Sequence, residues 1–209
     1  MSLTEDPRRA ALMEALRLKE LPRAGWARVG VQSPESVAAH SWGVAWLVVA
    51  LCPPHLDRGR ALAIAILHDL AEVRVGDLTP QDGVPKAEKA RREREALVGM
   101  VAALPNAEAL TALAEEYGVS PEGRLVKALD KLDMLLQARR YAEAQGVDTE
   151  EFVASALAAL EGEWAGLTRR PGAVSRRRGP PDGLHPPFMA LKPMRGRPHP
   201  LLMTLPYPT

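Results

Sequence analysis

Apolar residues recur every three or four positions through most of the first 167 residues of this chain, and helix-breaking residues separate the runs. This spacing predicts amphipathic helices, and prolines and glycines mark where each helix ends. No alternating pattern typical of a strand is present, and no internal repeat. The predicted helices span residues 8–20, 35–51, 58–72, 86–103, 106–117, 121–145 and 149–167. The sequence therefore predicts an all-α fold.

The predicted helix at 58–72 differs from the others, because its second half is apolar on nearly every side and then ends in charged residues. An all-round apolar surface predicts a central, buried helix. His68 and Asp69 close the apolar run, and Glu72 and Asp77 follow. At 100° per residue, His68, Asp69 and Glu72 share one side of the helix end. An unpaired aspartate is expensive to bury, so Asp69 must be paired or bound to a metal.

Two further predicted helices carry similar polar groups among apolar neighbours. His40 lies in helix 35–51, one turn from apolar residues on either side, and Asp130 has the same setting in helix 121–145. Two histidines and two aspartates on three apolar helices suit a divalent-metal site with mixed nitrogen and oxygen ligands. Such ligands favour Mn, Fe, Co or Ni over calcium, and Mg is also compatible.

Simpler interpretations of these residues remain open at the level of sequence. A His-Asp pair alone also fits a core histidine bonded to a neighbouring carboxylate. The helix that carries Asp130 also contains Asp133, and helical geometry alone places Asp133 deeper than Asp130. The charged stretch KAEKARREREALV alternates signs at helical spacing, which is typical of a solvated helix face.

Charge and proline content divide the chain at about residue 168. Residues 168–209 hold eight basic residues against one acidic residue, a charge of +7, and ten of the 19 prolines. The remaining residues hold 19 basic and 25 acidic residues, a charge of −6. We therefore predict one domain over 1–167 and an irregular or disordered Pro/Arg-rich tail over 168–209. A solvated tail is the simplest interpretation, and a basic arm that touches nucleic acid is the alternative. An altered reading frame would also explain the unusual charge and proline content of residues 168–209.

The remaining composition points to a reducing compartment. Cys52 is the single cysteine, which excludes a disulfide framework. The first twenty residues have no apolar stretch typical of a signal peptide, and the longest apolar run, 44–52, is too short to cross a bilayer. These features predict a cytoplasmic protein without a membrane segment.

Four stretches resemble one family in order and spacing. They are LPRAGW at 21–26, PESVAAHSW at 34–42, ILHDLAEVRVGDLTP at 66–80 and LVKALDKLDMLLQA at 125–138. The order of His40, His68-Asp69 and Asp130 resembles the HD-domain metal-dependent phosphohydrolases. The finer matches resemble the HD-domain 5′-deoxynucleotidases over roughly residues 10–165, whereas the tail has no counterpart in that pattern.

The resemblance implies an HD-domain helical bundle with one divalent cation in its core. It implies a usually homodimeric enzyme that hydrolyses deoxyribonucleoside 5′-monophosphates to deoxynucleoside and phosphate. Glu72 would orient or deprotonate the attacking water, and Asp77 would hold the sugar 3′-hydroxyl. Arg23 and Trp26 would line the phosphate and sugar pocket. The metal ligands implied by the resemblance are His40, His68, Asp69 and Asp130.

Purely structural roles also fit some of these side chains, and one position of the chain departs from the family pattern. Asp77 also suits a turn cap, and Trp26 suits a core aromatic. The residue before the first metal histidine is usually acidic in the family, whereas here it is Ala39. Because a dianionic substrate needs positive partners in this acidic body, basic residues should face the cleft. The candidates are Arg23, Arg28, Arg74 and Lys131.

Two other functions remain compatible with the sequence. The first is an HD-domain hydrolase of another nucleotide, either a nucleoside triphosphate or a signalling nucleotide. The second is a non-catalytic helical module that binds nucleotide or nucleic acid. The acidic body argues against a triphosphate, and a pure binder gains nothing from Glu72 beside a metal.

Overall fold

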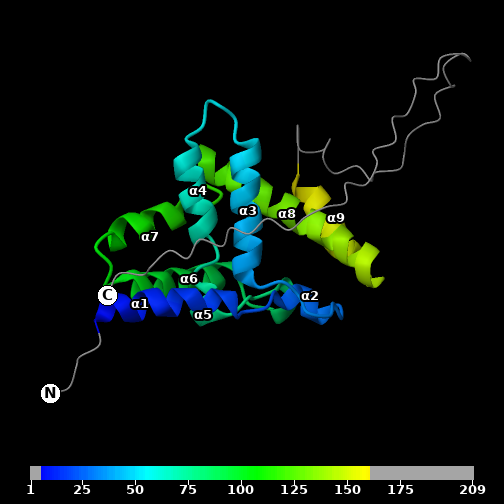
Figure 1. Cartoon of the computed structure of the whole chain (residues 1–209), viewed down its shortest axis with the longest axis horizontal. Coiled ribbons are helices and arrows are strands. Elements are labelled where there is room, and N and C mark those ends of the chain that lie inside the picture. Colours follow the sequence, from blue (N-terminus) through cyan, green and yellow to red (C-terminus); the bar gives the residue numbers. More distant parts are fainter. Residues whose placement is uncertain (1–5, 161–209) are drawn as a thin grey trace, which may run out of the picture. The chain divides into compact units, whose positions relative to one another are not determined.

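The structure is a computed structural model, and it describes residues 6–160. Helices and short turns make up this part of the chain, and the prediction of an all-α fold is confirmed (Figure 1). Its β pairing consists of one isolated bridge, between Pro22 and Ser36. The elements are α1 (Pro7–Leu16), η1 (Arg17–Lys19), α2 (Ala24–Arg28), α3 (Val37–Leu51), α4 (Arg58–Leu67), α5 (Glu72–Val75), η2 (Pro80–Asp82), α6 (Lys86–Val101), α7 (Ala107–Glu115), α8 (Pro121–Gln145) and α9 (Glu150–Ala159).

Three helices form the centre of the domain. In Figure 1, α3 and α4 stand side by side and α8 crosses both of them. Helix α9 packs on α8, and α7 lies between α4 and α6. The side chains at the crossing are fully buried, among them Val44, Ile64 and Leu129. Each such burial contributes roughly 1.5–3 kcal/mol, so the crossing of α3, α4 and α8 is a rigid place for functional groups.

The start of α3 differs from the prediction. The sequence predicted a helix from residue 35, whereas Ser36 is the N-cap of α3, and its hydroxyl accepts a hydrogen bond from the Ala39 amide at 3.2 Å. Residues 33–35 are instead held beside the segment before α2, because Arg23 N donates to Glu35 O at 2.9 Å. This pairing of distant segments has no local sequence signal.

The predicted helix 58–72 is interrupted, which corrects the geometry derived from it. Helix α4 ends at Leu67, residues 68–71 form a turn, and α5 begins at Glu72. Hydrogen bonds to the third preceding residue tighten this turn, for example from Glu72 N to Asp69 O at 3.0 Å. Helix α4 is also not buried on every side, because Ile66 is 58% exposed.

Most other predicted helices occur near their predicted bounds. Helix α8 begins and ends where predicted, with Ser120 as the N-cap and Gly146 in the left-handed conformation at its end. Helix α2 was not predicted. Residues 161–167 of the last predicted helix, and the whole of the tail at 168–209, lie outside the described residues. Within residues 6–160, none of the helices has the length and apolarity that crossing a membrane requires.

Candidate metal centre

The two predicted metal histidines meet in the core. His40 lies on α3, and His68 lies in the turn after α4, yet their ring centroids are 5.5 Å apart. Both side chains are nearly inaccessible, at 1% and 2% exposure. The crossing of α3 with α4 brings the two rings together.

Hydrogen bonds orient both imidazole rings in the same sense. His68 Nδ1 lies 2.8 Å from Ala65 O, so it is the protonated nitrogen and donates to that carbonyl. His40 Nδ1 lies 2.7 Å from Asp133 Oδ2 and donates to it in the same way. Both Nε2 atoms are buried and have no hydrogen-bond partner. Two neighbouring imidazole nitrogens without hydrogen-bond partners are suitable ligands for a metal ion.

Carboxylate oxygens surround the same point. Asp69 Oδ2 lies 3.2 Å from His68 Nε2 and 3.7 Å from His40 Nε2, and Asp130 Oδ1 lies 3.3 Å from His40 Nε2. The ligand atoms of His40, His68 and Asp130 all lie within 4.8 Å of one another. Adjacent ligands on one octahedral cation with bonds near 2.1 Å are about 3 Å apart. These distances are compatible with a single divalent cation, and the assignment of the four residues as its ligands stays a prediction.

The imidazoles and carboxylates of the cluster shift one another's pKa values. Burial alone would lower the pKa of His40, but the neighbouring carboxylates of Asp130 and Asp133 raise the pKa to about 9. The pKa of His68 is raised as well, because Asp69 outweighs the effect of burial. Burial opposes ionisation of Asp69 and Asp130, yet the two imidazoles keep the pKa of both carboxyls below its usual range. In the absence of a metal, protons on the histidines supply the charge that the carboxylates require.

This exchange of protons for metal predicts a pH dependence. Metal binding requires unprotonated imidazole, and the pKa of His40 near 9 means that it carries a proton at neutral pH. At lower pH, protons compete more strongly with the metal for the imidazole nitrogen. We therefore expect the apparent affinity for Mn2+ to fall about tenfold per pH unit, between pH 8 and 6, for each histidine that must lose a proton. Calorimetry in buffers of different ionisation enthalpy measures the released protons, and a flat affinity over this range would contradict the assignment.

Glu72 lies beside the cluster as a buried acid. The residue is 2% exposed, and its Oε2 has no hydrogen-bond partner. Burial, and then the nearby charges of Asp69 and Asp77, raise the pKa of Glu72 to about 9. A buried carboxyl with a strongly raised pKa next to a metal site is typical of a group that exchanges protons.

Arg23 and Asp77 lie next to the cluster, on the side of Asp69. Arg23 Nη1 lies 3.5 Å from Asp69 Oδ2 and 3.4 Å from Asp77 Oδ1. Asp77 Oδ2 also accepts a hydrogen bond from the Ala24 amide at 2.8 Å, which joins the loop after α5 to the start of α2. The structure thus brings both predicted substrate residues to the cluster. Their predicted contacts with substrate stay predictions.

Trp26 is placed differently from the other predicted residues. It is 2% exposed, and its ring packs 5.4 Å from that of Tyr141 and 4.4 Å from that of Phe152. Its indole N–H donates to Glu35 at 2.9 Å. This position corresponds to the core-aromatic interpretation of Trp26, and its predicted contact with substrate stays a prediction.

Asp130 is held by Lys131 and by Tyr117, a residue that the sequence did not identify. The Tyr117 hydroxyl donates to Asp130 Oδ2 at 2.6 Å, and its ring stacks on His68 with centroids 5.3 Å apart. Lys131 Nζ lies 3.0 Å from the same oxygen. Tyr117 lies just before the Gly118 turn, and no local pattern marks it as a site residue.

Most charged residues of the KAEKARREREALV stretch are exposed and form pairs three or four residues apart, as predicted for a solvated helix face, but Lys89 makes a further contact. Lys89 Nζ donates to the Leu78 carbonyl at 2.9 Å and lies 3.5 Å from Glu93 Oε1. Burial raises the pKa of Glu93. Lys89 therefore ties α6 to the loop that carries Asp77.

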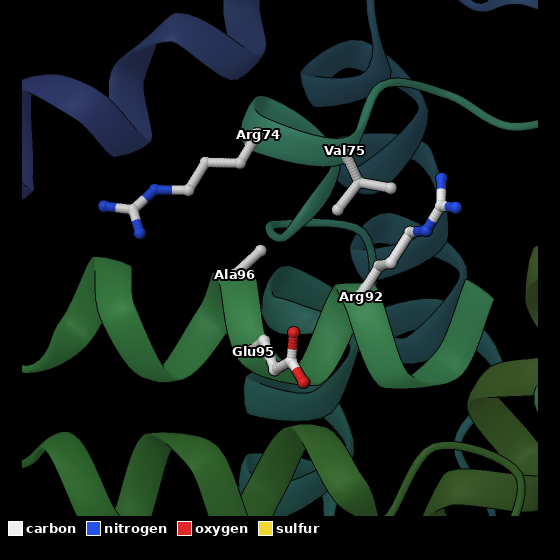
Figure 2. A pocket seen from close by; sticks show the side chains of 5 residues that line it. All are labelled: Arg74, Val75, Arg92, Glu95 and Ala96. Carbon is white, nitrogen blue, oxygen red and sulfur yellow. The ribbon is translucent and has the colours of Figure 1, made fainter. Parts of the chain in front are cut away.

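Two arginines expected at the cleft have other partners. Arg28 pairs with Glu151, and Arg74 Nε lies 2.6 Å from Glu14 Oε1 on α1. Arg74, Val75 and Arg92 line a hollow of about 450 Å³, and Figure 2 shows the side chains of Arg74 and Arg92 pointing away from each other. Of the basic candidates, Arg23 and Lys131 lie at the cluster.

Known proteins are similar to this chain in sequence and in fold. The family model described as the HD domain matches residues 15–166. That match covers well over half of the chain. The chain belongs to the HD domain family.

Relatives of this HD domain are similar in sequence and in structure. The chain is 40% identical over 134 residues to "5'-deoxynucleotidase HDDC2" of Danio rerio, covering 62% of this chain and 67% of the relative. It is 39% identical over 143 residues to the Homo sapiens protein of the same name, covering 65% of this chain and 70% of the relative. A conserved hypothetical protein from Pyrococcus furiosus shares the HD-domain fold with a TM-score of 0.60 and 36% identity, over 71% of this chain and 93% of that protein. The sequence alignments thus span about two thirds of the two relatives' length.

Proposed function

We propose that this protein is a metal-dependent phosphohydrolase, and specifically a 5′-deoxynucleotidase that converts deoxyribonucleoside 5′-monophosphates to deoxynucleoside and phosphate. The observation that carries the chemistry is the pair of orphaned Nε2 atoms of His40 and His68, which face Asp69 and Asp130 in the core. The substrate class is supported by 5′-deoxynucleotidases of the HD domain family with about 40% identity.

The metal would be held by His40, His68, Asp69 and Asp130. When bound, a divalent cation polarises a phosphoryl oxygen and lowers the pKa of water. Its ligand set suits Mn, Fe, Co, Ni or Mg, and the identity of the ion is a matter for measurement.

Glu72 is the base that the arrangement supports. Its pKa of about 9 belongs to the protein without metal, where burial and two carboxylates disfavour the charged form. A cation held at the site would favour the ionised form of Glu72. The Glu72 carboxylate would then orient the attacking water and accept its proton.

Arg23 and Asp77 provide the contacts for phosphate and sugar. Arg23 is buried between Asp69 and Asp77, and these carboxylates keep the pKa of the guanidinium above its usual value despite burial. Its planar fork suits bidentate contact with phosphate oxygens. Asp77, as an acceptor beside it, suits the sugar 3′-hydroxyl.

The test is a screen of phosphate release with and without added metal. We expect the purified chain to release phosphate from deoxyribonucleoside 5′-monophosphates with Mn, Co or Mg, and to lose this activity after chelation. The matched ribonucleotides test the sugar preference. Hydrolysis restricted to triphosphates would overturn the substrate class, and metal binding without any hydrolysis would favour a binding module.

A homodimer is part of the proposal, and α3 provides the surface for it. Trp42, Trp46 and Val49 lie on one face of α3 and are 70%, 55% and 45% exposed. Monomers rarely leave two neighbouring tryptophans in water, because burial of each ring removes about 150–250 Å² from solvent. A two-fold axis places the same face of a second copy against this stripe.

Replacement of Trp46 with glutamate is expected to convert the dimer to a monomer, because it places a charge in an apolar interface. Light scattering coupled to size exclusion measures the mass. Val119→Glu is the matched control, since Val119 is 68% exposed but lies outside the stripe. A monomeric wild type, or a Trp46→Glu variant that stays dimeric, would contradict this surface.

A cytoplasmic location also belongs to the proposal. The thiol of Cys52, the single cysteine of the chain, is buried and free. A reducing compartment suits a chain that has no disulfide to form.

A further inference from the structure

Asp133 makes a short contact with a proposed metal ligand, although it is not itself part of the cluster. Its Oδ2 lies 2.7 Å from His40 Nδ1, on the side of the ring opposite Nε2. A neutral imidazole that donates from Nδ1 presents its lone pair at Nε2. Asp133 therefore selects the tautomer of His40 that a metal at the cluster requires.

Gly43 makes room for this carboxylate. It lies in the interior of α3, where glycine is a poor helix former. A Cβ atom on Gly43 would lie 3.0 Å from Asp133 Cγ and closer still to Oδ1. Real Cβ atoms essentially never show such contacts, so any larger residue at 43 would displace Asp133. The glycine thus allows α8 to bring its acid against the His40 ring.

The position of Ala39 agrees with this role. The residue before His40 is Ala39, which is exposed, on the outer side of α3. A carboxylate there would face away from the buried His40 ring. The carboxylate that reaches the ring comes instead from α8.

We propose that Asp133 is a positioning residue that orients His40 for metal binding, and that Gly43 is required for it to do so. The inference rests on the proposed metal site at His40. Partners of metal-bound histidines typically change metal affinity by 10–100-fold when they are removed. Asp133 would act through the imidazole and not by contact with the metal or the substrate.

The experiment is a double-mutant cycle read by Mn2+ affinity in calorimetry, without substrate. We expect Asp133→Ala to weaken Mn2+ binding about 10–100-fold. Asp133→Asn keeps an acceptor for the Nδ1 proton, so it should lose less. We expect Gly43→Ala to weaken binding in the wild-type background, because it displaces the acid. In the Asp133→Ala background the same change should have no further effect on affinity, and it should raise the melting temperature of the metal-free protein.

Controls separate this role from general destabilisation. Glu143→Ala removes an exposed acid from the same helix and should leave Mn2+ affinity unchanged. Melting of each metal-free variant reports its fold. Asp133→Ala with wild-type affinity would overturn the inference, as would Gly43→Ala with wild-type affinity. A wild-type chain that binds no Mn2+ would overturn the metal site itself and so the proposed function.

Discussion

Replacing His68 with asparagine is expected to abolish metal binding and to lower phosphate release about 1000-fold or more. The cation contributes several kcal/mol to the stabilisation of transition-state charge, and each 1.4 kcal/mol is a factor of ten. His68 contributes one of the two unpartnered Nε2 atoms, and the amide of asparagine is a weak substitute for imidazole. Metal content of the purified variant and its activity on a deoxyribonucleoside monophosphate measure the two effects together.

The control for this variant is His55→Asn, because His55 is exposed and lies outside the cluster. It should keep full metal content and activity. Melting of the metal-free proteins must be compared as well, since His68 also stacks on Tyr117. A folded His68→Asn variant with normal metal content would remove His68 from the ligand set.

Replacing Glu72 with glutamine is expected to lower kcat by roughly 100- to 10,000-fold, the range for loss of a general base. Glutamine keeps the shape of the side chain but cannot accept a proton. Because Glu72 is not among the proposed ligands, Mn2+ affinity should stay near the wild-type value. Steady-state kinetics at saturating metal, with calorimetry on the same sample, separate the two quantities.

The same substitution should also stabilise the metal-free protein above pH 5. The pKa of Glu72 is raised from 4.5 to about 9, so the folded state holds its proton after the unfolded state has lost it. Stability therefore falls as pH rises between these values, and Glu72→Gln should remove that slope. Glu108→Gln, an exposed acid on α7, is the matched control. Unchanged kcat in Glu72→Gln would remove this residue from the mechanism.

Local sequence signals accounted for most helices because each signal acts within a few residues. Helix α8 carried a serine cap, a proline in its first turn and a glycine after its last residue, and its predicted and observed bounds coincide. The predicted start of α3 was wrong because a contact with a distant part of the chain decides where this helix begins. The hydrogen bond from Val37 N to Leu21 O holds the preceding residues in an extended path. Helix α2 has five residues, too few to show a period.

Helical geometry alone could not decide between Asp130 and Asp133. A helical projection ranked Asp133 as the deeper residue, whereas its side chain is 17% exposed and that of Asp130 is 7% exposed. The projection assumed one buried face, but α8 contacts α3, α4 and α9. The family resemblance, and not the projection, identified the aspartate that lies beside both histidines.

The sequence by itself determined the helical class of the domain and the residue types that gather at its centre. Burial of Asp69 demanded a partner, and the positions of His40 and Asp130 on apolar helices indicated where that partner would lie. The tertiary structure alone decided how each group is oriented. Asp133 reaches His40 across 93 residues of chain, and Tyr117 supports Asp130 from another element. Such contacts depend on how helices cross, and a pattern of three or four residues carries no information about that crossing.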